Sequence, residues 1–65
     1  MNWDRIEGNW KKFKGKAKQK WGEFTDDELD RLDGKREELI GKIQEKKGIA
    51  RDAAEREVDK WANTL

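Results

Sequence analysis

The sequence has 65 residues, of which 48% are charged and 32% are hydrophobic, and its formal net charge is +1. This length suits one small domain spanning residues 1–65. The absence of Cys excludes disulfides and thiol chemistry, and the absence of His, Ser and Tyr removes most catalytic nucleophiles and bases. We therefore expect a protein without enzyme activity, bound metal or cofactor.

The N-terminal segment, MNWDRIEGNW, is charged and lacks the apolar core of a signal peptide. No apolar run approaches the length of a membrane span. A chain this rich in Lys, Glu and Asp, with no Pro, is typical of helix throughout. The sequence thus predicts a cytoplasmic, all-α protein.

The first predicted element is a helix from Trp3 to Trp21, closed by a left-handed cap at Gly22. Its apolar residues form a stripe about 80° wide on a helical wheel. Gly8, Gly15 and Gly22 lie opposite this stripe. Three explanations stay open: the helix breaks near Gly8, another backbone approaches this face, or a cost of up to about 1 kcal/mol per glycine is tolerated.

Six lysines surround the stripe, and no acidic residue lies between Glu7 and Glu23. Lysines interleaved with aromatic rings suit a nucleic acid or an acidic membrane surface as partner. Alternatively, the rings form the core and the lysines face the acidic second helix of the same chain, which the near-zero net charge favours. The candidate anion-binding residues are Lys11, Lys12, Lys14, Lys16, Lys18 and Lys20.

A short second helix is predicted to start at a capping box formed by Thr25 and Glu28, with Phe24 and Leu29 as a hydrophobic staple. It ends near Asp33-Gly34. Its acidic residues do not follow the spacing of a calcium-binding loop, so we expect a capped helix start and a solvated face. These acids are Asp26, Asp27, Glu28, Asp30 and Asp33.

Two more helices are predicted over Lys35–Lys47, closed by Gly48, and over Arg51–Thr64. An i,i+4 pair of Glu38 with Lys42 supports the first of them. Ala50 is a poor N-cap for the second. Short connections between these elements predict antiparallel helical hairpins.

The frame of Gly8–Gly22 returns 26 positions later as Gly34–Gly48, which indicates one helical unit used twice. The glycines superimpose, and Phe13 falls on Leu39. We expect the glycine rows to serve internal packing rather than association with a second chain. The aligned glycines are Gly8, Gly15 and Gly22 with Gly34, Gly41 and Gly48.

Several short motifs carry a resemblance to a known family. They are Gly8-Asn9-Trp10-Lys11, Phe13-Lys14-Gly15-Lys16, Trp21-Gly22, Thr25-Asp26-Asp27, Gly34-Lys35-Arg36, Leu39-Ile40-Gly41-Lys42-Ile43-Gln44 and Gly48. On these residues nearly the whole chain, to about Trp61, resembles the CsbD-like family of small bacterial general stress-response proteins. The resemblance implies a cytoplasmic protein that accumulates under stress, with no catalytic residues to transfer. The family usually has an aromatic residue where this chain has Lys47, so the packing at the end of the third helix is left open.

The resemblance also implies a fold of two helical hairpins packed crosswise, as in SAM-like domains. Together the observations predict a monomeric all-α domain of four short helices with a degenerate internal repeat. Its function is predicted as a non-enzymatic stress-response protein, with weak nucleic acid or anionic lipid binding as the alternative. The predicted core is Trp3, Ile6, Trp10, Phe13, Ala17, Trp21, Leu29, Leu32, Leu39, Ile43, Val58 and Trp61.

Overall fold

The computed structural model describes residues 3–65 and contains helices only within them. This confirms the all-α prediction, although the helices number five instead of four because the expected first helix is divided at Asn9. The SAM-like arrangement stays a prediction. The helices are α1 (Trp3–Gly8), α2 (Trp10–Lys20), α3 (Asp26–Leu32), α4 (Arg36–Lys47) and α5 (Arg51–Asn63).

The division between α1 and α2 comes from the backbone conformation of one residue, Asn9. Asn9 has φ −119° and ψ 35°, outside the helical range, while its side-chain amide donates to the Arg5 carbonyl at 2.9 Å. Ile6 and Trp10 on either side are both buried. The chain therefore changes direction without interrupting the apolar stripe. Of the three explanations that the sequence left open for Gly8, the structure shows the break in the helix.

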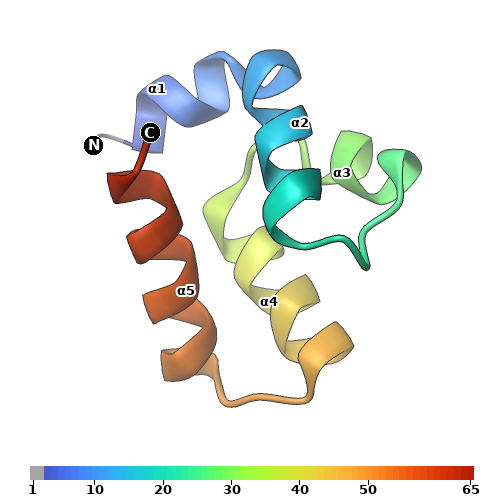
Figure 1. The fold of residues 1–65 in the computed structure, drawn as a ribbon, viewed down its shortest axis with the longest axis vertical. Helices are drawn as coiled ribbons and strands as arrows, with labels where there is room; N and C mark the ends of the chain where they lie inside the picture. Colours follow the sequence, from blue (N-terminus) through green and yellow to red (C-terminus); the bar gives the residue numbers. More distant parts are fainter. Residues whose placement is uncertain (1–2) are drawn as a thin grey trace.

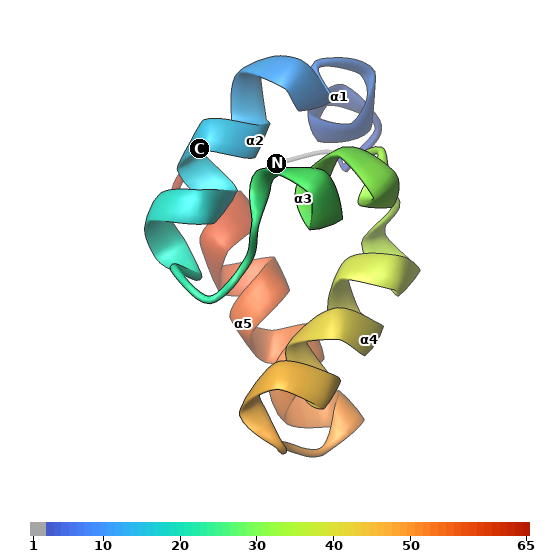
Figure 2. The same cartoon turned by 90° about the vertical axis from the view of Figure 1, so that its right-hand side faces the viewer.

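The other three helices pack against α1 and α2. In Figure 1, α4 and α5 form a hairpin that turns at the bottom of the view, and α1 and α2 cross above it. Figure 2 shows α3 set against α2, beside the upper end of α4. Gly48 allows the tight turn after α4, since it has φ 64° and its N–H donates to Gln44 O at 2.8 Å. The predicted closure at Gly48 is confirmed.

The predicted end of α2 was wrong by one residue, and so was its cap. Gly22 does not have a positive φ; the helix ends at Lys20, and Trp21, with φ −120° and ψ 84°, caps it through an N–H bond to Ala17 O. Burial explains the difference, since Trp21 is only 2% exposed and leaves helical geometry as its ring enters the core. The capping box of α3 is confirmed, with Glu28 N donating to Thr25 Oγ1 at 3.2 Å and Thr25 N donating to Glu28 Oε1 at 2.9 Å.

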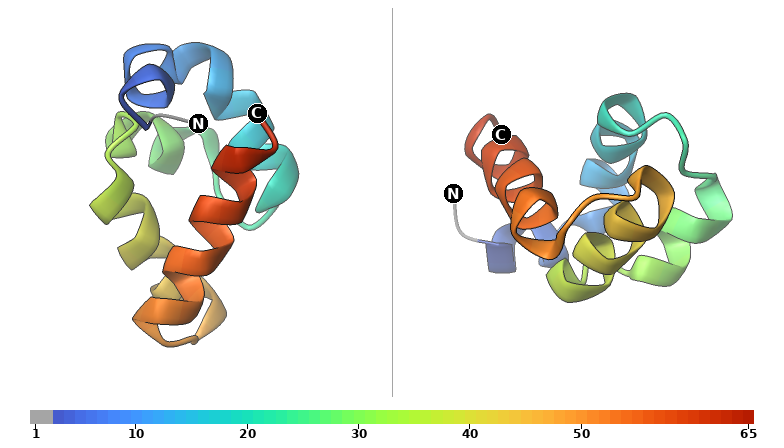
Figure 3. Two further views of the ribbon diagram at one scale, coloured as in Figure 1. Left: turned by 90° about the vertical axis from the view of Figure 1, so that its left-hand side faces the viewer. Right: turned by 90° about the horizontal axis from the view of Figure 1, so that it is seen from below.

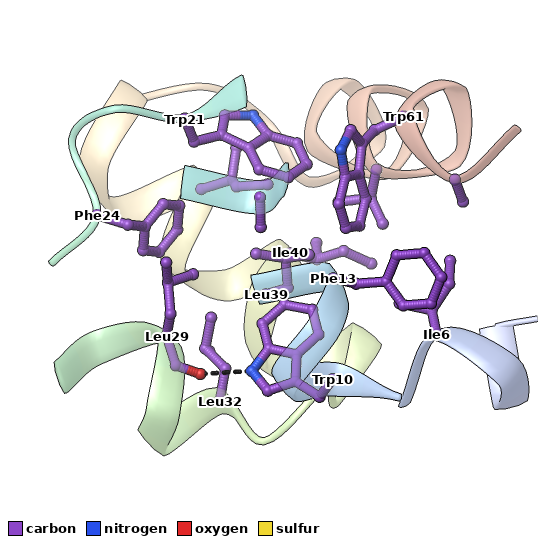
Figure 4. Close-up of a cluster of buried hydrophobic side chains, with 14 of the residues drawn as sticks. Ile6, Trp10, Phe13, Trp21, Phe24, Leu29, Leu32, Leu39, Ile40 and Trp61 are labelled. Atoms are coloured by element: carbon purple, nitrogen blue, oxygen red, sulfur yellow. Dashed lines mark hydrogen bonds between the residues drawn. The ribbon is translucent and has the colours of Figure 1, made fainter. Parts of the chain in front are cut away.

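The buried side chains form one hydrophobic cluster, shown in Figure 4. Every predicted core residue belongs to it except Trp3, which is half-buried and packs against its edge. The predicted core missed Phe24, Ile40, Ala54 and Ala62, which are also buried. Phe24 and Leu29 are both core residues, in agreement with the roles expected for a staple.

Three indole nitrogens tie separate elements together. Trp3 Nε1 donates to Gly34 O at 2.7 Å, and Trp10 Nε1 donates to Leu29 O at 2.7 Å, the bond drawn in Figure 4. Trp21 Nε1 donates to Glu57 Oε1 at 3.1 Å. The Trp61 ring lies between two of these indoles, with centroids 5.2 Å from Trp21 and 6.0 Å from Trp3. Each buried donor is therefore satisfied inside the fold.

The glycine rows do not serve packing as expected. A Cβ added at Gly8, Gly15, Gly22 or Gly41 would meet nothing within 4 Å. Gly34 is different, because it has φ 76° and an added Cβ would lie 2.9 Å from Glu7 Cα. The repeat places glycines at matching positions, but close packing requires only this one.

Candidate anion-binding face

The structure divides the six candidate lysines of α2 into two groups. Lys14 and Lys18 point toward α3, where Lys14 Nζ lies 2.7 Å from Asp30 Oδ1 and Lys18 Nζ lies 3.0 Å from Asp26 Oδ1. The hydrogen bond to Asp30 raises the pKa of Lys14, and the hydrogen bond from Lys18 lowers the pKa of Asp26. Two of the six positive charges are thus neutralised within the chain, as the alternative interpretation expected.

The remaining four lysines, Lys11, Lys12, Lys16 and Lys20, are exposed. Among residues 3–65, no carboxylate lies within ion-pair distance of their ammonium groups. Lys12 Nζ lies 5.7 Å from the centroid of the neighbouring Phe13 ring. We call these four residues the open basic face, the α2 lysines without an ion pair. Lys12, Lys16 and Lys20 follow one another at one-turn intervals along one side of α2, whereas Lys11 lies on the side of Lys14 and Lys18.

The aromatic rings of α2 are not part of this face. Trp10, Phe13 and Trp21 are 6%, 5% and 2% exposed. Stacking on a base or insertion into a bilayer would first require them to leave the core. In the folded chain the lysines and the rings therefore have separate roles, and the rings form the core.

A hollow of about 330 Å³ adjoins the open basic face. The end of α5 approaches α2 there, as the left panel of Figure 3 shows. Sequence reasoning missed this hollow because its walls come from opposite ends of the chain, and no local pattern indicates that they meet. It is lined by Lys16, Gln19, Lys20, Trp61, Thr64 and Leu65.

A second hollow, of about 430 Å³, lies between α3 and α4. Its lining includes Leu32 and Gly41 and charged side chains of both signs, among them Arg31 and Glu38. The predicted Glu38–Lys42 pair is not formed here; Lys42 Nζ lies 3.8 Å from Glu45 Oε2 instead. The mixed charges give this hollow no preference for one kind of ion.

Most acidic residues of α3 have basic partners in the chain. Besides the two lysine pairs, Glu28 Oε2 lies 2.8 Å from Lys46 Nζ. This bond and the bond from the Thr25 backbone lower the pKa of Glu28 to about 2. In the part of the chain that the structure describes, no three acidic side chains come together as a metal site.

Lys47, where the family usually has an aromatic residue, forms a polar contact. Its Nζ lies 3.0 Å from Glu57 Oε1, the same carboxylate that accepts the Trp21 indole bond. The end of α4 is therefore held to α5 by an ion pair. This answers the packing question that the sequence left open.

The two hydroxyl side chains have structural contacts. Thr25 caps α3, and Thr64 Oγ1 donates to Trp61 O at 2.7 Å. The sequence contains no His that could activate either hydroxyl. Within residues 3–65, none of the helices is long and apolar enough to cross a bilayer.

Comparison with known proteins gives close matches along the chain. The model of the CsbD-like family matches residues 4–56. UPF0337 protein YjbJ of Escherichia coli O6:H1 is 56% identical over 61 residues, covering 94% of this chain and 88% of the relative. A UPF0337 protein of Nitrosomonas europaea is 57% identical over 63 residues, covering 97% and 67%, and one of Rhodopseudomonas palustris is 54% identical over 65 residues, covering 100% and 98%. No solved structure matches the chain.

Proposed function

The chain belongs to the CsbD-like family, and from this premise we propose that it is a non-enzymatic general stress-response protein, monomeric and cytoplasmic. The observation that carries the proposal is the internal use of its reactive groups. Both threonine hydroxyls and three indole N–H groups are bonded within the fold, and most acids of α3 have basic partners. Such a domain acts through its charged surface and not through a catalytic centre.

The test is a measurement of abundance and fitness in the organism of origin. We expect the protein level to rise several-fold after salt, heat or ethanol shock. A deletion strain should recover more slowly than its parent. Expression of the unmodified protein, with all six α2 lysines, should restore recovery in that strain. A constant level across these treatments, with no change in recovery, would contradict the proposal.

A second candidate function is an anion-binding module for a nucleic acid or an acidic membrane surface. The specific observation in its favour is the open basic face, because no carboxylate in residues 3–65 lies within ion-pair distance of its four lysines. Lysines that neutralise phosphates give affinity that falls as salt rises. The face offers this interaction without any change in the core.

Titration with inorganic polyphosphate tests this second candidate in its simplest form. We expect binding at low salt that weakens steeply at near-physiological salt. Changing Lys11, Lys12, Lys16 and Lys20 together to Gln should abolish it. Binding that survives this fourfold change would show that another surface is responsible.

A further inference from the structure

The hollow beside α2 combines charged, polar and apolar groups within a small volume. Its volume of about 330 Å³ lies at the lower end of the range for small-molecule pockets, roughly 300–1,000 Å³. A group the size of one flat ring fits such a space. Long acyl chains and folded peptide segments are too large for it.

One wall of the hollow carries positive charge. Lys16 and Lys20 are one helical turn apart on α2, about 6 Å along its axis, and Lys12 precedes them by another turn. No carboxylate of the described residues lies within ion-pair distance of the three ammonium groups, although Lys20 interacts electrostatically with Glu57 at longer range. They form a row of available ammonium groups that leads into the hollow.

The other groups around the hollow suit a ring with polar edges. The half-buried Leu65 supplies apolar surface, whereas Trp61, only 5% exposed, adds little to it. Gln19 offers an amide donor and acceptor, and the Thr64 oxygen can still accept a hydrogen bond while its proton is donated to Trp61 O. A nucleobase has this pairing of flat apolar faces with donor and acceptor edges.

We propose that Lys12, Lys16 and Lys20 bind the phosphates of a single-stranded nucleic acid and that the hollow receives one of its unstacked bases. The inference rests on the second candidate function and names its ligand. A duplex keeps its bases stacked inside, so it presents only phosphates to this surface. A membrane is disfavoured because the aromatic rings of α2 are buried and its outer face carries lysines, Gly15 and Gln19, which give acyl chains no apolar surface.

The experiment measures fluorescence anisotropy of an end-labelled oligothymidylate of roughly ten nucleotides. With three phosphates neutralised, the logarithm of the binding constant should fall against the logarithm of salt concentration with a slope of about −2. The single strand should bind more tightly than a duplex of the same length. Vesicles rich in phosphatidylglycerol, tested by co-sedimentation, should bind more weakly than the oligonucleotide.

Two pairs of variants locate the contact. Lys16→Gln with Lys20→Gln should weaken binding at least tenfold. Lys14→Gln with Lys18→Gln removes the same charge from the paired side of α2 and should change affinity less than threefold. Thermal unfolding of both double variants shows whether each remains folded.

The second pair adds one negative charge at either end of α5. Leu65→Asp places a carboxylate at the hollow and should weaken binding about tenfold. Ala50→Asp places the same charge at the exposed start of α5 and should change affinity less than threefold. The difference between these variants separates a site at the hollow from a response to net charge.

Each outcome supports or overturns one proposal. If both lysine double variants weaken binding equally, or if vesicles bind better than the oligonucleotide, the single-strand site is wrong. Polyphosphate and duplex could bind through Lys16 and Lys20 with the same affinity as the single strand, and Leu65→Asp could have the same effect as Ala50→Asp. In that case the anion-binding function is supported and the base site is wrong. Failure of polyphosphate and oligonucleotide alike to bind overturns both.

Discussion

The indole nitrogen of Trp21 donates to Glu57 Oε1 at 3.1 Å, and this bond joins the end of α2 to the middle of α5. The same carboxylate also accepts from Lys47 Nζ at the end of α4. The Trp21 bond first, and then the Lys47 bond, lower the pKa of Glu57. One carboxylate thus connects three helices at the edge of the core.

Removing this carboxylate is expected to destabilise the fold measurably. Glu57→Ala leaves the buried Trp21 N–H without an acceptor, at a cost of about 1–3 kcal/mol. Glu57→Gln keeps an oxygen acceptor and should lose less. Urea denaturation followed by tryptophan fluorescence measures both free energies of unfolding. Equal losses for the two variants would mean that the charge, and not the indole bond, matters.

The stability is expected to fall in acid and to stay constant at neutral pH. The folded pKa of Glu28 is about 2, below the ordinary 4.5, so its carboxylate stabilises the fold above pH 4.5. As the pH falls from 4.5 toward 2, the unfolded chain takes up the proton first and this stability is lost. The lowered pKa values of Asp26, Glu37 and Glu57 act in the same direction. No His is present to titrate between pH 5 and 8.

Unfolding midpoints in urea, measured from pH 7 down to pH 2, check this pH dependence. Glu28→Gln should give a flatter acid profile than the parent protein. Glu23→Gln is the matched control, because Glu23 is exposed and has no ion-pair partner within residues 3–65. The explanation fails if both variants keep the parent's acid slope.

The cap of α3 gives a third prediction. Thr25→Ala removes the oxygen that accepts from Glu28 N and should lower the free energy of unfolding by about 0.5–2 kcal/mol. Thr25→Ser retains that oxygen and should remain within a few tenths of a kcal/mol of the parent. Thermal unfolding by circular dichroism distinguishes the two. Similar melting for Ala and Ser would show that the capping bond contributes little.

Glycine-to-alanine substitutions are expected to change the free energy of unfolding in opposite directions at different positions. Gly15→Ala and Gly41→Ala lie inside helices with open space at the added methyl group, so each should stabilise by about 0.5–1 kcal/mol. Gly34→Ala should destabilise by more than about 1 kcal/mol, because its φ is 76° and its Cβ would lie 2.9 Å from Glu7 Cα. Urea denaturation of the three variants measures the signs. A stabilising Gly34→Ala would contradict the close approach to α1.

The parts of the fold that follow local rules were predictable from sequence. The apolar stripe, the Thr25 capping box and the turn at Gly48 depend on neighbouring residues and were confirmed. The end of α2 was not predicted, because Trp21 leaves the helix to satisfy the distant core and Glu57. The local sequence pattern predicted the cap of this helix at Gly22, but tertiary packing places it at Trp21.

The candidate site was predictable only in part. Spacing showed that six lysines share α2, but it gave no means of knowing which of them face Asp26 and Asp30. That division depends on where the loop from Trp21 to Thr25 places α3. The hollow lined by Trp61 and Leu65 likewise depends on the return of α5 to α2, which is a long-range relationship.

The three indole bonds join residues 31, 19 and 36 positions apart. Trp3, which precedes the first copy of the repeat, reaches Gly34 at the start of the second copy, Trp10 reaches Leu29 between the copies, and Trp21 reaches Glu57 beyond the second copy. A peptide containing only Gly8–Gly22 would have no partner for Trp10 or Trp21 and would expose both rings to water. We therefore expect the two units that are visible in the sequence to unfold together as one. Limited proteolysis should yield either the intact domain or small peptides.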